Sequence, residues 1–134
     1  MSRSDILDLF EQHGIQATPQ RIEIAEIFLT RPQHLSAEQI IERLHEKGSS
    51  VSKATVYNTL NRFADRGLAR EIMVDPVRKI YDSSTHTHQH FYNVDTGELC
   101  DIENDTIRLA ELPELPTGTE RESVDVVIRI RNTN

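Results

Sequence analysis

Four stretches in the first half of the chain share one pattern, and this pattern limits how the chain can fold. Each begins with a helix-capping residue, continues with apolar residues three and four positions apart, and stops at a glycine or a proline. This spacing puts the apolar side chains on one face of a helix, which must then pack against another element. The sequence therefore predicts four amphipathic helices, over residues 4–14, 18–31, 36–48 and 52–66.

The residues at the predicted helix starts are typical capping residues. We expect Ser4 to cap the first helix with Asp5 in its first turn, and Thr18-Pro19 to open the second. Ser36 and Gln39 have the spacing of a capping box, in which each side chain binds the other residue's backbone N–H.

A β-hairpin is predicted directly after the fourth helix. Segments 68–74 and 78–82 flank the turn dipeptide Asp75-Pro76. Helices followed by a hairpin are the order of elements in a winged helix, in which one helix enters the major groove of DNA. We therefore predict an N-terminal winged helix-turn-helix, with residues 52–66 as its recognition helix.

The outward face of this fourth helix suits DNA. Its apolar residues lie within a narrow arc, which leaves small, amide and hydroxyl side chains opposite, and residues 53–70 carry a net charge of +3. We expect Tyr57 to contact thymine methyls or bases and Arg62 to contact a base edge or a phosphate. The residues expected to contact DNA are Arg21, Lys53, Thr55, Tyr57, Asn58 and Arg62. An ordinary solvated face is the alternative, although such a face usually carries more glutamate.

The second half predicts a small unit of mixed structure, so the fold class as a whole is α+β. Segments 91–94 and 99–102 read as strands around the turn Asp95-Thr96-Gly97, and a short helix is expected over 104–112. Residues 123–131 alternate apolar and polar side chains, as a half-buried strand does. Because about fifty residues bury too small a core to be stable alone, we expect this unit to pair with a second copy.

Histidines are concentrated where the two halves meet. His86, His88 and His90 lie at every second position, which puts them on one face of an extended strand, and Asp82 and Asp101 add carboxylate oxygens. Imidazole and carboxylate donors without sulfur suit Fe(II), Mn(II) or Zn(II). The pattern predicts a metal site, with solvated histidines along a polar strand as the alternative.

Composition narrows the classes of function. The net charge is −7, of which −1 falls on residues 1–82 and −6 on residues 83–134, so any DNA contact must come from a local patch.

No stretch is long and apolar enough to span a bilayer, and we expect a cytoplasmic protein that is not an enzyme. The single cysteine, Cys100, excludes an intrachain disulfide, and we expect it to be buried.

Together these motifs resemble the ferric uptake regulator family of metal-dependent repressors, over nearly the whole chain. The segments that carry the resemblance are Thr18-Pro19-Gln20-Arg21, His34-Leu35-Ser36-Ala37-Glu38, Ala54-Thr55-Val56-Tyr57 and His88-Gln89-His90. The resemblance implies a winged-helix DNA-binding domain over residues 1–82 and a small α/β dimerisation and metal-sensing domain over residues 83–134. It also implies a homodimer on palindromic double-stranded DNA.

The resemblance further implies one regulatory metal ion per subunit, placed between the two domains. Fe(II) or Mn(II) is expected, with Zn(II) as a further candidate in purified protein. The implied ligands are His34, Asp82, His88, His90 and Asp101.

Departures from the family pattern reduce the number of expected metal sites. Asn93 and Thr96 stand where much of the family has a Cys-x-x-Cys pair for structural zinc, and Arg108 and Ser123 stand where relatives place ligands of a further site. We therefore expect no structural zinc and only one metal ion per subunit. Gln16 replaces a basic residue that often reaches the minor groove in relatives.

The two aspartates resemble those of the peroxide-sensing repressors, in which peroxide oxidises a ligand histidine, here His34 or His88. The alternative is an iron response regulator, which senses iron or haem without peroxide chemistry. Members of that branch also lack the cysteine pairs, but they have three consecutive histidines that have been tied to haem. Gln89 interrupts this run, so we expect no haem.

Two other classes compete with a regulator. A cupin-like oxygenase would use His88 and His90, but cupins consist of many regular strands and the first half of this chain is predicted to be helical. A metal-buffering or protein-binding winged helix that does not touch DNA would fit the acidic balance. Sequence-specific DNA binding separates both from the predicted repressor.

Overall fold

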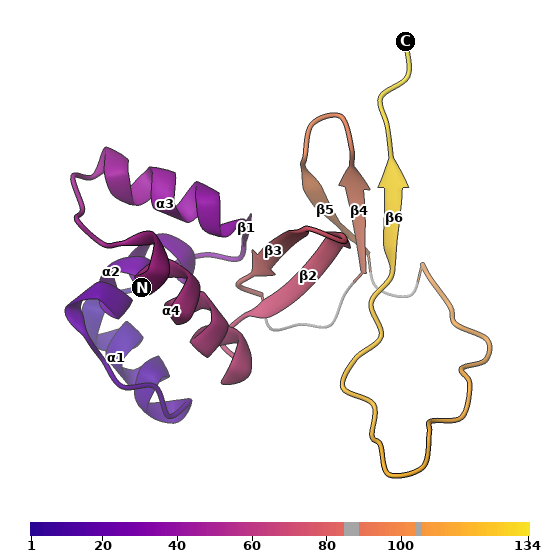
Figure 1. Ribbon diagram of the computed structural model, residues 1–134, viewed down its shortest axis with the longest axis horizontal. Helices are drawn as coiled ribbons and strands as arrows, with labels where there is room; N and C mark the ends of the chain where they lie inside the picture. The colour runs from indigo at the N-terminus through magenta and orange to yellow at the C-terminus, as the bar shows by residue number, and fades with distance from the viewer. Residues whose placement is uncertain (85–88, 104–105) are drawn as a thin grey trace. The chain divides into compact units, whose positions relative to one another are not determined.

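The computed structural model describes residues 1–84, 89–103 and 106–134, which form two compact units, Met1–Thr85 and His86–Asn134. In the first unit, four helices precede a β-hairpin, and the chain in the second unit forms a small sheet (Figure 1). This order confirms the predicted α+β fold class. Among the described helices, none combines the length and the apolar character that crossing a bilayer requires.

The four helices begin and end close to the predicted positions. Their bounds are Arg3–Gln12 for α1, Pro19–Phe28 for α2, Ala37–Glu46 for α3 and Lys53–Asp65 for α4. Thr18, Ser36 and Ser52 cap α2, α3 and α4 through their side-chain oxygens. The predicted capping box of α3 is confirmed, with Gln39 Oε1 accepting from the Ser36 N–H at 2.9 Å.

The predicted cap of α1 was wrong by two residues. Ser2, not Ser4, is the N-cap, and Asp5 is the third helical residue, whose carboxylate accepts from the Ser2 N–H at 2.8 Å. This hydrogen bond lowers the pKa of Asp5 below its ordinary value. An aspartate three residues after a serine closes the reciprocal hydrogen bonds of a capping box, and Ser4 has no such partner at that spacing.

The helices pack around one aliphatic core. Helix α2 contacts α1, α3 and α4, which explains why its buried residues lie on more than one face: Ile22, Ile24, Ala25, Ile27 and Phe28. The rings of Phe10 in α1 and Phe63 in α4 lie 5.6 Å apart between centroids, and both residues are buried. The recognition helix therefore rests on the remaining helices through its apolar face.

The wing consists of β2, Arg70–Asp75, and β3, Arg78–Asp82. Asp75 Oδ1 accepts the backbone N–H groups of Val77 and Arg78 at 2.9 and 2.8 Å, which closes the predicted turn. A short strand that the sequence did not indicate, β1 at His34–Leu35, pairs antiparallel with β3 to give the order β1-β3-β2. This extra strand places His34 directly opposite Asp82.

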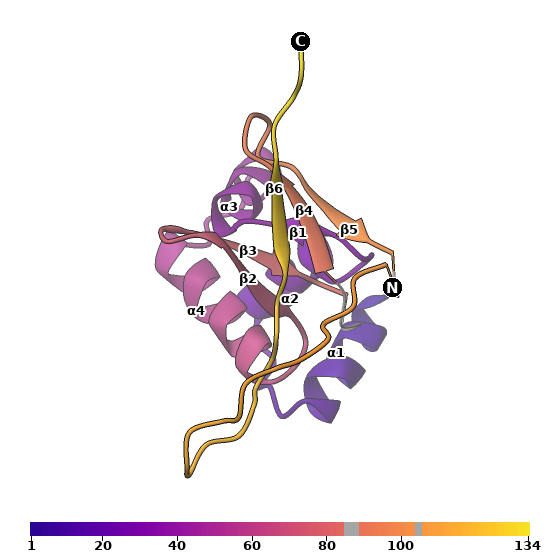
Figure 2. The ribbon, with the colours of Figure 1, turned by 90° about the vertical axis from the view of Figure 1, so that its right-hand side faces the viewer.

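The second unit contains a three-stranded sheet of order β5-β4-β6, with β4 at Gln89–Asn93, β5 at Leu99–Ile102 and β6 at Val127–Ile130. Strand β5 is antiparallel to β4, and β6 runs parallel to β4 on its other side (Figure 2). Gly97 has a φ of 75°, a left-handed conformation that glycine adopts without steric cost in the turn between β4 and β5.

Three predictions for the second unit were wrong. Within the described residues 106–112 there is no helix, and the chain there leaves the sheet in a long loop (Figure 1). Leu109 and Leu112 are 48% and 44% exposed, so no apolar surface within the unit stabilises a helix there. The last strand is shorter than predicted, and its Ile128 and Ile130 are exposed rather than half-buried. Cys100 is also exposed, on the side of its strand opposite to the buried Leu99 and to Asp101.

Candidate metal centre and nucleic-acid interface

The first unit holds one histidine–aspartate pair. Strand pairing sets His34 opposite Asp82, and His34 Nε2 lies 3.4 Å from Asp82 Oδ2. The Asp82 side chain is completely buried, and its Oδ1 accepts the Ser84 N–H at 2.8 Å. Three hydrogen bonds between Gln33 and Ser83 hold the ends of β1 and β3 together next to the pair. The fold thus presents an imidazole and a carboxylate from residues that are distant in sequence.

The second unit repeats this arrangement. His90 in β4 stands opposite Asp101 in β5, with His90 Nε2 3.3 Å from Asp101 Oδ1. The His90 side chain is buried, whereas the Asp101 side chain is 54% exposed. Cross-strand neighbours lie on the same face of a sheet, so both donor atoms point to one side of β4 and β5. Cys100 precedes Asp101 on the same strand and faces the other side.

The donor chemistry of the two pairs fits a divalent first-row metal ion. Each pair brings an imidazole nitrogen and a carboxylate oxygen close together, and neither contains sulfur. The charge of Asp82 is compatible with the same conclusion, because a facing cation offsets part of the cost of burying a carboxylate. Of the five predicted ligands, His34, Asp82, His90 and Asp101 fall into these pairs. His88, like His86, lies outside the described residues.

The outward face of α4 carries the predicted DNA-contacting side chains. Lys53, Asn58 and Arg62 are exposed, and Tyr57 is 39% exposed. Thr55 is half-buried, and its hydroxyl lies 2.9 Å from the Ser52 hydroxyl at the helix start. The buried residues of the helix are Val56, Thr59, Leu60 and Phe63. The fold therefore leaves the polar side of α4 open, as a groove-reading helix requires.

A residue that the sequence did not indicate as functional holds Tyr57. The Tyr57 hydroxyl donates a hydrogen bond to a carboxylate oxygen of Glu38 in the first turn of α3. This bond lowers the pKa of Glu38 and raises the pKa of Tyr57. Glu38 is therefore charged at neutral pH, and its carboxylate holds the Tyr57 ring in one orientation on the polar face of α4.

Arg21 lies at the start of α2 rather than on α4. Its side chain is half-buried, and its guanidinium donates to the backbone carbonyl of Gln16 at 2.7 Å. This contact ties the loop before α2 to the first turn of the helix. Gln16 is exposed in that loop.

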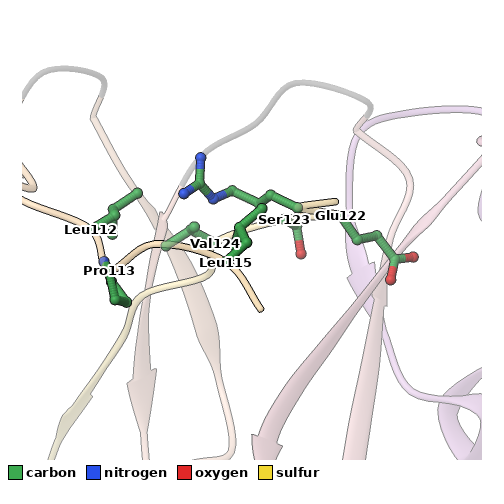
Figure 3. A pocket seen from close by; sticks show the side chains of 7 residues that line it. Leu112, Pro113, Leu115, Glu122, Ser123 and Val124 are labelled. Atoms are coloured by element: carbon green, nitrogen blue, oxygen red, sulfur yellow. The ribbon is translucent and has the colours of Figure 1, made fainter. Parts of the chain in front are cut away.

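Two of the positions that depart from the metal-binding pattern, Asn93 and Ser123, make other local contacts. Asn93 Oδ1 accepts the backbone N–H groups of Asp95 and Thr96 and so shapes the turn after β4. Ser123 lines an open hollow of about 370 Å³ on the loop that precedes β6 (Figure 3). The lining side chains that Figure 3 labels are Leu112, Pro113, Leu115, Glu122, Ser123 and Val124, a mainly apolar set.

The chain combines a winged helix, whose α4 has an open polar face, with two histidine–aspartate pairs. This combination is typical of metal-dependent regulators. The comparison with protein families agrees. The chain belongs to the ferric uptake regulator family, whose model matches residues 12–128.

The relatives of this chain include ferric uptake regulation proteins and peroxide-responsive repressors. The ferric uptake regulation protein of Vibrio cholerae is 33% identical over 107 residues, which cover 78% of this chain and 71% of that protein. The peroxide-responsive repressor PerR of Staphylococcus aureus is 32% identical over 104 residues, covering 75% of this chain and 70% of that protein. Among solved structures, the Pseudomonas aeruginosa ferric uptake regulator with manganese superposes with a TM-score of 0.69 at 25% identity, covering 95% and 97% of the two chains.

Proposed function

We propose that this protein is a metal-dependent transcriptional repressor that binds operator DNA through α4 and holds one Fe(II) or Mn(II) ion per subunit. The observation that carries the proposal is the pair of histidine–aspartate contacts, one on each sheet, in a chain of this family. Such a protein acts in the cytoplasm by binding, not by turning over a substrate.

The proposed ligands are His34 and Asp82 from the first unit and His90 and Asp101 from the second, with His88 as the fifth. The chemistry of the donors supports this set. The structure of the Pseudomonas aeruginosa ferric uptake regulator with manganese supports a divalent metal ion as the ligand. Binding of the ion to these donors would favour the DNA-binding conformation of the protein. The ion shifts this equilibrium only by its difference in affinity for the two states.

We further propose that the metal site responds to peroxide. In the net reaction, peroxide would transfer one oxygen atom to the imidazole of His34 or His88 and would itself be reduced to water. Bound Fe(II) would supply the one-electron chemistry that cleaves the O–O bond. Loss of an imidazole ligand weakens the site and releases DNA. With Mn(II), the same ligands would hold the ion without this oxidation. Similarity to the Staphylococcus aureus repressor supports this response.

The proposed assembly on DNA is a homodimer bound to a palindrome. Two recognition helices read such a site when they stand roughly 34 Å apart, one turn of DNA. The second unit exposes the apolar surface that a partner would cover. Its exposed large apolar residues are Val94, Leu109, Leu112, Leu115, Ile128 and Ile130.

Operator affinity tests the proposal directly. An operator is first selected from a random duplex library with the Mn(II)-loaded protein, and affinity is then measured with Mn(II) or Fe(II), anaerobically, before and after stoichiometric peroxide. We expect binding to be lost only in the Fe(II) form, with an added oxygen atom on a peptide containing His34 or His88. Retained binding with both histidines unmodified would refute the peroxide response.

The second candidate is an iron response regulator without peroxide chemistry. Its support is the similar identity of the Vibrio cholerae ferric uptake regulation protein, 33% against 32% for the peroxide-responsive repressor. In the same experiment, metal-dependent operator binding that survives peroxide in the Fe(II) form would select this candidate.

A further inference from the structure

The amide of Asn61 is held by the wing. The buried Tyr81 in β3 donates a hydrogen bond from its hydroxyl to Asn61 Oδ1 at 3.0 Å. Asn61 lies on α4, 20 residues away in sequence, and its side chain is exposed. An exposed asparagine normally rotates freely about its last bond, but here one end of the amide is fixed by a residue of the core.

Asn61 lies on the polar, outward face of α4. At 100° per residue, Asn61 falls between Tyr57 and Asn58, almost opposite the buried arc of Val56 and Phe63. Tyr57 is held from α3 by Glu38, and Asn61 is held from β3 by Tyr81. Two neighbouring side chains on this face are thus oriented by residues outside the helix.

The direction of the hydrogen bond between Tyr81 and Asn61 determines which amide atoms of Asn61 remain available to bind DNA. A tyrosine hydroxyl that donates to the amide oxygen turns that oxygen toward the wing and leaves the NH₂ group on the other arm of the amide. An asparagine that reads adenine uses both its acceptor and its donor. Asn61 is suited instead to donate hydrogen bonds.

We infer that Asn61 contacts operator DNA as a hydrogen-bond donor to an acceptor atom, and that Tyr81 is the positioning residue that orients its amide. The acceptor belongs either to a base edge in the major groove or to a phosphate oxygen; both sources share this chemistry. The inference rests on the proposed function, because it requires that α4 binds DNA.

The experiment is a double-mutant cycle on the selected operator with Mn(II). Wild type, Asn61→Ala, Tyr81→Phe and the double variant are compared by dissociation constant, and circular dichroism verifies that each is folded. We expect Asn61→Ala to weaken binding roughly tenfold, as the loss of a specific contact does. Tyr81→Phe should weaken binding in the wild type but have no effect when Asn61 is already alanine.

Two results would overturn the inference. Equal operator affinity of Asn61→Ala and wild type would remove Asn61 from the interface. An equal effect of Tyr81→Phe in both backgrounds would show that Tyr81 acts on the fold rather than through Asn61. Failure of the proposed function has a different signature, because the wild type itself would then select no DNA.

Modified operators identify the acceptor. Single base acceptors are removed by 7-deazapurines for N7, by 2-aminopurine for guanine O6 and by 5-methyl-2-pyrimidinone for thymine O4. Single methylphosphonates remove the charge of one phosphate. At the contacted position, the modification should weaken the wild type and leave Asn61→Ala unchanged. If the two proteins respond alike to every base and phosphate modification, the donor role is wrong.

Discussion

Replacing Asp82 with asparagine removes a charge that the fold keeps away from water. The carboxylate is completely buried, lies 3.4 Å from His34 Nε2 and accepts the Ser84 N–H. Asparagine has the same shape and can still accept the Ser84 hydrogen bond through its amide oxygen. The variant should therefore fold, but it loses the negative charge that a divalent ion would neutralise.

The size of the effect follows from linkage. Removing a residue that hydrogen-bonds to a metal ligand without touching the ion lowers the metal affinity roughly 10- to 100-fold. Removing the charge of the ligand itself should therefore lower the metal affinity by at least about 100-fold. At a metal concentration of about 100 times the wild-type Kd, binding stabilises the wild type by about 2.7 kcal/mol. The variant would be half-saturated and would gain only about 0.4 kcal/mol. At roughly 4 °C per kcal/mol, the metal-induced increase in Tm should shrink by about 9 °C.

The assay is thermal unfolding with and without Mn(II) at that concentration. Asp8→Asn is the matched control, because Asp8 is an exposed aspartate on the outer face of α1, and it should keep the full increase in Tm. If Asp82→Asn shows the same Mn(II)-induced increase as the wild type, Asp82 is not a ligand and the proposed site is wrong.

Three further predictions concern the core, the wing and the second unit. Phe63→Ala should lower the free energy of unfolding by about 3–5 kcal/mol in urea denaturation, because Phe63 is fully buried against Phe10; a loss below about 1 kcal/mol would contradict this packing. Burial raises the pKa of Tyr81 to about 12, so its contribution to stability should be complete below pH 10 and decline between pH 10 and 12. The difference in absorbance at 295 nm between wild type and Tyr81→Phe should show an ionisation step near pH 12, and a step at pH 10 in the folded protein would be inconsistent with burial. Ile128→Lys should shift the protein from dimer to monomer in sedimentation, whereas Val77→Lys, at the exposed wing turn, should not; an unchanged dimer in the first variant would place the interface elsewhere.

The helical half of the fold could be predicted from the sequence because its signals are local. Caps and apolar spacing act within one or two turns of helix, and Ala37, Ile40, Ile41 and Leu44 are all buried as their spacing indicated. The second half was harder to predict because its structure depends less on such local signals. Its apolar residues at 107–115 are at most half-buried, and Leu112 and Leu115 only line an open hollow, so their spacing alone could not decide between helix and loop.

The candidate site also has a part that could be predicted from the sequence and a part that could not. His34, Asp82, His90 and Asp101 were recognisable by their chemistry and by resemblance to the family, and the face of α4 by its polar composition. Which residues contact one another was not recognisable. His34 with Asp82, Glu38 with Tyr57 and Asn61 with Tyr81 are pairs 19 to 48 residues apart.

The sequence by itself therefore determined the helices, the turn of the wing and the kinds of donor atoms that the chain can offer. Only the tertiary structure decided that a two-residue strand sets His34 against Asp82, and that the wing and α3 orient two side chains of α4. The physical reason is that capping and helix formation depend on neighbours within a few residues. Cross-strand and inter-element contacts exist only after the packed core has brought distant segments together.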